Sequence, residues 1–143
     1  MAKMAKPSGS GVRAQASARL VDAMRAHPDL IAGEGGACTE LMRAMGGKVA
    51  IKTGAEAVYT AILPEPGLGI AVKIIDGGTR AAEAAIAGLL VKYGGLDANH
   101  PMARKRLYGP ILSRRGLHAG HMQLSSGSVS YTHLRAHETR STI

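Results

Sequence analysis

Hydrophobic side chains recur at helical spacing in two long segments, and they alternate with other residues in the stretch between these segments. The first pattern begins at Arg13 and is expected to end at His27, because a residue before proline avoids helical backbone angles. The second is expected to take Thr79 as its N-cap and to end at Gly94. The apolar positions are Ala16, Leu20, Ala23 and Met24 in the first segment, and Ala82, Ile86, Leu89, Leu90 and Tyr93 in the second.

The alternating stretch predicts strands over residues 49–52, 57–62 and 68–74. Because links as short as these join neighbouring antiparallel strands, we expect a three-stranded antiparallel meander flanked by helices, which is an α+β fold. Shorter helical segments are expected at residues 28–31 and, with Thr39 as N-cap, at residues 40–45.

The chain has 143 residues, which allows one domain with a core of its own. Residues 1–12 are rich in Lys, Pro, Ser and Gly, and we expect a linker or an internal segment of a longer parent there. Residues 13–124 are expected to form the globular unit. Within this unit the pattern is weak after residue 95 and contains a basic run at residues 104–106.

Residues 125–143 are expected to be a disordered tail of artificial origin. The string VSYTHLRAHET, from Val129 to Thr139, resembles the translation of a transposase-type sequencing adapter. His133 and His137 lie four residues apart, as helical metal ligands do. Because an adapter was never selected to bind a metal ion, we assign this pair no such role.

The composition excludes several classes of protein. One cysteine cannot form an internal disulfide or a multi-cysteine zinc site, and no apolar run is long enough to span a membrane. The first residues also lack the apolar region of a secretory signal, so a cytoplasmic protein without membrane contact is expected. The formal charge of +8 raises the question of nucleic acid, but aromatics make up only 3% of the residues, too few for base-stacking modules. Nucleic acid is therefore not the expected partner.

The triplet Lys52-Thr53-Gly54 stands at the end of the first expected strand. A lysine beside a cleft of low dielectric can hold a carboxylate or a developing oxyanion, or act as a base when it is desolvated. Threonine adds a hydroxyl donor, and glycine lets a substrate approach the backbone. The same triplet lines the serine nucleophile of class A β-lactamases and penicillin-binding proteins. By itself it also fits an ordinary solvated lysine at a strand end.

Four sequence blocks, at residues 24–35, 38–42, 52–59 and 69–77, make the triplet more informative. In this order they resemble the C-terminal part of the bacterial L-asparaginase II family, the serine-dependent rhizobial type. The resemblance implies a β-lactamase-like or glutaminase-like fold. It also implies hydrolysis of L-asparagine to L-aspartate and ammonia through an acyl-enzyme, with a small-molecule substrate and a homodimeric parent.

The same resemblance implies roles for individual residues. Lys52 corresponds to the active-site lysine of the family, and Thr53 and Gly54 line the site for the substrate. Glu34 is expected to face the cleft. Cys38 corresponds to a position close to the lysine, although a small buried hydrophobe is the alternative reading of this residue. At Gly36 the sequence departs from the arginine that the family usually has there.

The family's nucleophile belongs to a Ser-x-x-Lys motif upstream of the matching region, and this chain contains no such motif. An acyl-enzyme needs a nucleophile that a neighbouring base activates. We therefore expect a fragment that is inactive alone. No cofactor is expected, because the zinc-binding cysteines of the members that have them also lie upstream.

Two other interpretations remain open. Lys-Thr-Gly alone does not separate an asparaginase from a β-lactamase or a glutaminase-like amidohydrolase, and a short protein without the catalytic half could serve as a basic binding module. A strong dependence of nucleic-acid binding on salt would support the basic module. His118 and His121, as well as Lys73 and Glu83, are expected to be solvated surface residues.

Overall fold

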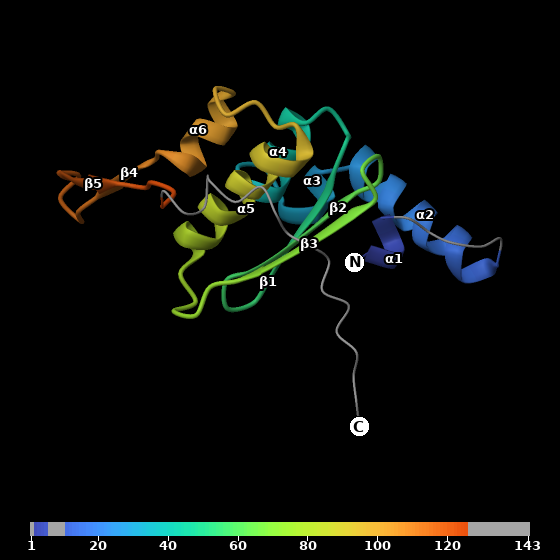
Figure 1. Ribbon diagram of the computed structural model, residues 1–143. Helices are drawn as coiled ribbons and strands as arrows, with labels where there is room; N and C mark the ends of the chain where they lie inside the picture. Colours follow the sequence, from blue (N-terminus) through green and yellow to red (C-terminus); the bar gives the residue numbers. More distant parts are fainter. Residues whose placement is uncertain (1, 6–10, 126–143) are drawn as a thin grey trace.

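The computed structural model describes residues 2–5 and 11–125, so the expected tail lies almost entirely outside the described residues. Figure 1 shows helices gathered around a small sheet, with a separate hairpin at one end. The elements in chain order are α1 (Ala2–Ala5), α2 (Val12–Ala26), α3 (Asp29–Ala32), α4 (Ala37–Ala44), β1 (Ala50–Gly54), β2 (Val58–Leu63), β3 (Leu68–Lys73), α5 (Thr79–Gly94), α6 (Pro101–Leu107), β4 (Pro110–Leu112) and β5 (His118–His121).

The three central strands form the expected antiparallel meander in the order β1-β2-β3, which confirms the α+β fold. In the β1–β2 ladder Ile51 lies opposite Ala61, and Thr53 lies opposite Tyr59. Since successive side chains of a strand point to opposite faces, these four residues share one face of the sheet. Lys52 lies opposite Thr60, and the side chains of these two residues leave the strands on the other face.

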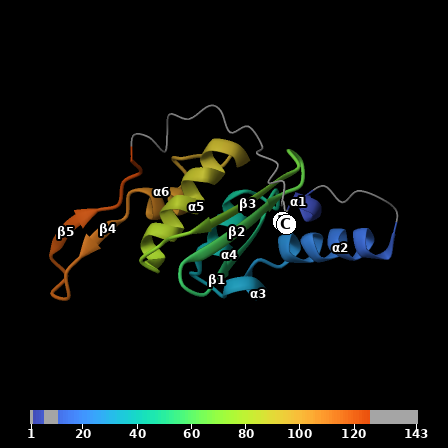
Figure 2. The ribbon, with the colours of Figure 1, turned by 60° about the horizontal axis from the view of Figure 1, so that its bottom comes forward.

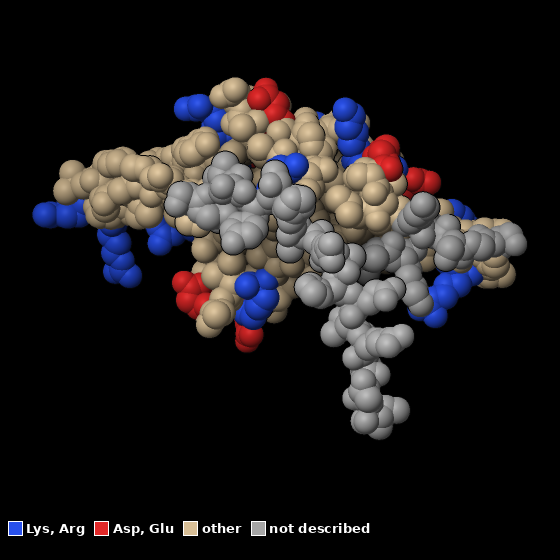
Figure 3. Space-filling view, viewed as in Figure 1, with Lys and Arg blue, Asp and Glu red and all other residues tan. Residues whose placement is uncertain are grey.

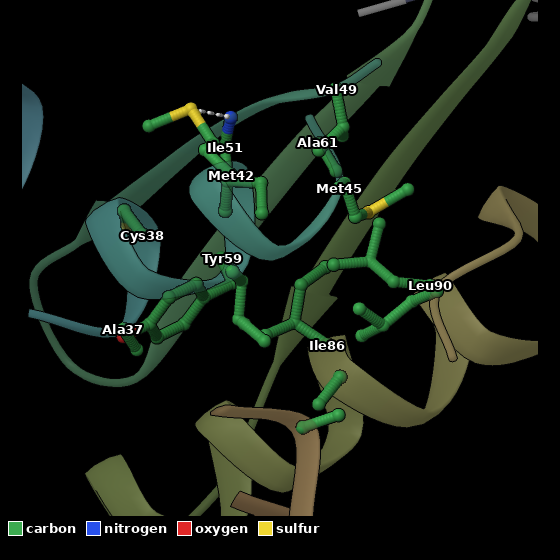
Figure 4. Packing of buried hydrophobic residues seen from close by; sticks show 14 of the residues in the cluster. Ala37, Cys38, Met42, Met45, Val49, Ile51, Tyr59, Ala61, Ile86 and Leu90 are labelled. Carbon is green, nitrogen blue, oxygen red and sulfur yellow. Dashed lines mark hydrogen bonds between the residues drawn. The ribbon is translucent and has the colours of Figure 1, made fainter. Parts of the chain in front are cut away.

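Helices α4 and α5 cover the face of the sheet that carries Ile51 and Tyr59, and α1 and α2 lie against the other face at one end (Figures 1 and 2). Figure 4 shows Tyr59 from the sheet lying between α4 and α5. The sulfur of Met42 accepts a hydrogen bond from the backbone N–H of Ile51 over 3.3 Å, which ties α4 to β1. The chain has no Phe or Trp, so aliphatic side chains and methionine fill most of this core.

Helix α2 presents a different face to the sheet from the one that its apolar spacing predicts. Val21 is its buried residue, whereas Leu20 is 59% exposed. Val21 and the partly buried Met24 pack on Ala50 and Ile62. The helix is nearly as polar on one side as on the other, so its apolar pattern alone could not select the face.

Both predicted threonine caps are wrong. Helix α4 begins at Ala37 after the N-cap residue Gly36, and Thr39 is buried inside the helix, where its hydroxyl donates to the Pro28 carbonyl over 3.0 Å. Helix α5 begins at Thr79 itself, with Gly78 as its N-cap. Thr39 therefore forms a tertiary hydrogen bond instead of capping α4, and Thr79 is the first helical residue of α5 instead of its cap.

The weakly patterned region after residue 95 forms α6 and the two-stranded sheet of β4 and β5. This hairpin stands clear of the body of the molecule (Figures 1 and 2). Near the other end of the chain, the helix α1 replaces part of the expected linker, and its Ala5 is buried against the sheet.

Candidate active site

The Lys-Thr-Gly triplet lies at the end of β1, which is an edge strand of the three-stranded sheet. Lys52 is exposed, and its ammonium donates to the carbonyl of Thr53 over 2.6 Å. Thr53 is half-buried on the face that α4 covers, and its hydroxyl donates to the Val58 carbonyl over 3.5 Å. Since successive side chains of a strand point to opposite faces, Thr53 points toward α4 while Lys52 starts from the opposite face of the sheet.

Cys38 lies on the first turn of α4, fully buried next to this strand end. Burial raises the pKa of its thiol, while a hydrogen bond from the Thr53 backbone and the positive charge of Lys52 act in the opposite direction. The structure thus places Cys38 within electrostatic reach of Lys52. The side chain also has the burial of a small core residue, and the raised pKa keeps the thiol protonated at neutral pH.

Tyr59 and Glu83 join the same group of polar side chains, and sequence reasoning assigned neither of them to the site. The hydroxyl of Tyr59 donates to Glu83 Oε1 over 3.5 Å. Burial raises the pKa of Tyr59 to about 12, with the charge of Glu83 adding to the effect and a hydrogen bond from Thr53 opposing it. Tyr59 is therefore a neutral hydrogen-bond donor at neutral pH.

The expectation that Glu83 lies on a solvated helix face is wrong, since its side chain is only 26% exposed. The spacing of Glu83 from apolar residues of the same helix already indicated partial burial. Ile86 and Ala87 follow it by three and four residues, and both are fully buried. Residues at this spacing share a helix face, so the carboxylate lies on the apolar side of α5.

Arg106 on α6 is a buried cation that forms an ion pair with Glu83. Its side chain is 4% exposed, its Nε lies 3.3 Å from Glu83 Oε2, and its Nη1 forms an ion pair with Glu40. Its Nη2 donates to the Gly35 carbonyl over 3.2 Å. Among the buried side-chain nitrogen and oxygen atoms of the described residues, only Nε and Nη1 of Arg106 lack a hydrogen-bond partner. Their contacts with the two carboxylates are therefore mainly ionic.

Glu34 is held by another arginine, Arg43 on α4. Both of its carboxylate oxygens accept hydrogen bonds of 2.7 Å from Arg43, which lower the pKa of this exposed carboxyl. It lines a hollow between α4 and α6 together with Glu40 and His100. The expected role of Glu34 in binding substrate stays a prediction.

Gly36 leaves no space for a side chain. A Cβ at this position would lie 2.6 Å from the Ala32 carbonyl oxygen and 2.9 Å from the Ala32 Cβ. An arginine here would require α3 to move relative to α4. No anion contact is therefore assigned to this loop.

The lowered pKa of Glu40 leads to a prediction of how the stability of the chain depends on pH. Burial tends to raise the pKa of this carboxyl, but hydrogen bonds from Lys105 and the positive charges of Arg106 and Lys105 outweigh it and lower the pKa. A carboxyl with a lowered pKa in the folded state stabilises the fold above its ordinary pKa, and this stabilisation is lost as the pH falls through the lowered value. Urea unfolding at a series of pH values from 7 to 3 should therefore show a decreasing free energy of unfolding below about pH 4.5.

The variant Glu40→Gln should show a smaller decrease over the same range. Glu65→Gln is the matched control, because Glu65 is 61% exposed and pairs with Arg25 at the surface. An unchanged pH dependence in Glu40→Gln would contradict this assignment.

The described residues contain no group of three His, Cys, Asp or Glu side chains that could hold a metal ion. His118 and His121 lie at the two ends of β5, both exposed. Within the same part of the chain, none of the helices has the length and apolar character needed to cross a membrane.

Comparisons with known proteins add one finding. The family model described as L-asparaginase II matches residues 1–124. A search of curated proteins finds none that matches this chain. The matched range includes the triplet, Cys38 and the buried cluster around Arg106.

Proposed function

The chain belongs to the L-asparaginase II family, and from this premise we propose that it supplies the Lys-Thr-Gly side of an active site that hydrolyses L-asparagine to L-aspartate and ammonia. The observation that carries the proposal is the placement of Lys52. Its ammonium is held by the Thr53 carbonyl at an open strand edge, and its charge opposes the rise that burial causes in the pKa of the Cys38 thiol. A fixed positive charge of this kind stabilises a carboxylate or a developing oxyanion.

The chemical step in this proposal is attack by a serine on the side-chain amide carbon, which forms an acyl-enzyme and releases ammonia; water then releases L-aspartate. Lys52 holds negative charge on the substrate or helps to activate the serine. Thr53 offers a hydroxyl donor, and Gly54 leaves room for the substrate beside the strand. The serine and its base are not in this sequence, which has no Ser-x-x-Lys. Accordingly, the 143-residue chain alone should release no ammonia from asparagine.

No metal step enters this mechanism. Zinc bound by the cysteines of other family members would find a poor site here, since Cys38 is the one cysteine of the chain and the described residues contain no metal-ligand group. The proposal also places the protein in the cytoplasm, as part of a homodimeric parent.

A chimeric enzyme tests the proposed role of Lys52. Residues 23–90 would replace the matching segment of an active L-asparaginase II that has its own Ser-x-x-Lys. We expect the chimera to release ammonia from L-asparagine, and Lys52→Ala to lower kcat/KM by roughly 10²–10³-fold, the effect of losing one group that stabilises developing charge. Lys48→Ala, which removes an exposed lysine just before β1, is the control. Equal activity in the two variants would contradict the role of Lys52.

The same chimera separates the rival functions. Faster hydrolysis of glutamine or of a β-lactam than of asparagine would favour the corresponding amidohydrolase. A basic binding module is less consistent with the surface in Figure 3, where Lys and Arg are interspersed with Asp and Glu over the visible face. Nucleic-acid binding with a steep salt dependence would nevertheless support the module.

A further inference from the structure

Three helices converge on a cluster of charged side chains behind the Lys-Thr-Gly strand. We define the Arg106 cluster as Glu40 on α4, Glu83 on α5, and Lys105 and Arg106 on α6. Lys105 and Arg106 share the carboxylate of Glu40, and Arg106 alone reaches Glu83. The two cations and two carboxylates balance in charge, which matters because an uncompensated buried charge is strongly unfavourable.

Glu83 connects this cluster to the sheet through its two oxygens. Oε2 lies 3.3 Å from Nε of Arg106, and Oε1 accepts the hydrogen bond from the Tyr59 hydroxyl over 3.5 Å. One oxygen of the Glu83 carboxylate is therefore paired with the Arg106 guanidinium, and the other accepts the hydrogen bond from Tyr59. The orientation of Tyr59 depends in this way on a cation in a helix 47 positions further along the chain.

Tyr59 in turn contacts the triplet. It is the cross-strand partner of Thr53 on the same face of the sheet, so the two side chains are direct neighbours. Within the strands, the Thr53 hydroxyl has only long hydrogen bonds, 3.4 Å to the Gly54 carbonyl and 3.5 Å to the Val58 carbonyl. The strands alone therefore hold this hydroxyl loosely, and the Tyr59 side chain is the cross-strand neighbour that can limit its direction.

We propose that Glu83, held by Arg106, is a positioning residue for the Lys-Thr-Gly triplet, and that it acts through the Tyr59 hydroxyl on the hydroxyl of Thr53. The inference rests on the proposed function for its catalytic meaning, because Thr53 is the group that would meet the substrate. Its structural content, a coupling from α6 to the end of β1, can be measured in the 143-residue chain without any activity.

The experiment compares amide chemical shifts of the full chain, labelled with nitrogen-15, in three single variants. Glu83→Gln keeps the shape of the side chain but removes the charge that faces Arg106. Tyr59→Phe removes only the hydroxyl. Glu56→Gln is the control, since Glu56 is an exposed glutamate in the β1–β2 turn that pairs loosely with Lys73 and lies nearer to the triplet in sequence than Glu83 does.

We expect the amide signals of Thr53 and Gly54 to shift in Glu83→Gln and in Tyr59→Phe, and to stay within the scatter of unaffected residues in Glu56→Gln. The signals of α6 should shift in Glu83→Gln and remain in place in Tyr59→Phe. A cluster that only supports the packing of α6 would move the α6 signals and leave Thr53 and Gly54 unchanged in both variants, and that result overturns the proposal. If Glu83→Gln does not fold, unchanged Thr53 and Gly54 signals in Tyr59→Phe overturn it equally.

Kinetics of the chimera extended to residues 23–107 separate this inference from the proposed function. With asparagine as substrate, Glu83→Gln should lower kcat/KM about 3- to 30-fold, and Glu83→Asp, which keeps the charge, should recover part of the loss. Coupled amide shifts together with an inactive chimera would contradict the proposed function and leave the coupling established. An active chimera in which Glu83→Gln has the parent kcat and KM would contradict the positioning role and leave the proposed function in place.

Discussion

Replacing Arg106 by alanine is expected to lower the free energy of unfolding by about 3–5 kcal/mol, the usual cost of breaking a buried ion pair on one side. The guanidinium is 4% exposed and forms ion pairs with Glu40 and Glu83, whose side chains are 16% and 26% exposed. Without it Glu83 loses its cation, and the Gly35 carbonyl loses the hydrogen bond from Nη2. Urea denaturation followed by circular dichroism measures the change.

Arg104→Ala is the matched control for this prediction. It removes an arginine from the same helix two residues earlier, where the side chain is exposed and lies over the ring of Tyr108. Its cost should stay within about 1 kcal/mol, as for other exposed cation–π contacts. Similar losses in the two variants would show that the helix tolerates neither change, and the special role of Arg106 would have to be abandoned.

Replacing Leu41 by alanine is expected to cost about 3 kcal/mol, within the range of 2–5 kcal/mol seen for buried leucines. Leu41 is fully buried on α4, where it belongs to the core cluster that joins this helix to the sheet and to α5. Neighbouring side chains in this core are packed against both helices and the sheet, so they can collapse only partly into the cavity. Thermal and urea unfolding of the variant give the loss directly.

Leu30→Ala provides the comparison, because Leu30 is 79% exposed on α3. The same atoms are removed there without opening a cavity, and the free energy of unfolding should change by less than about 0.5 kcal/mol. If both leucine variants lost the same stability, the packing of α4 described above would be wrong.

The strands and helix α5 could be predicted because their local patterns agree with the tertiary structure, whereas the pattern of α2 predicted the helix but not its buried face. Ile70 and Val72 alternate as a strand requires, and both pack against the core. The caps could not be predicted in the same way. Thr39 has the side chain of a good N-cap, yet its hydroxyl satisfies the Pro28 carbonyl 11 residues earlier, a partner that no local pattern reveals.

The candidate site likewise has one part that local sequence predicts and one part that only the tertiary structure brings together. The triplet at Lys52 follows from a local motif, whereas the cluster behind it is assembled from residues far apart in sequence; Glu40 and Lys105 are separated by 65 positions. The basic run that contains Arg106 resembles a solvated surface in sequence. Helix α6 turns Arg106 inward while Lys105 remains 54% exposed and Arg104 stays on the surface. Burial of one member of a charge run is decided by what the fold places opposite to it.

The hairpin of β4 and β5 gives the molecule a second, weaker level of cooperativity. Its strands pair with each other, and Leu112 and Leu117 remain 57% and 65% exposed, so little apolar burial holds it in place. Its backbone amides can therefore exchange with solvent through local opening, while those of β2, which pairs on both sides, must wait for a much larger unfolding event. One chain thus carries two unfolding free energies, and the measured stability will depend on whether the reporter group lies in the hairpin or in the sheet.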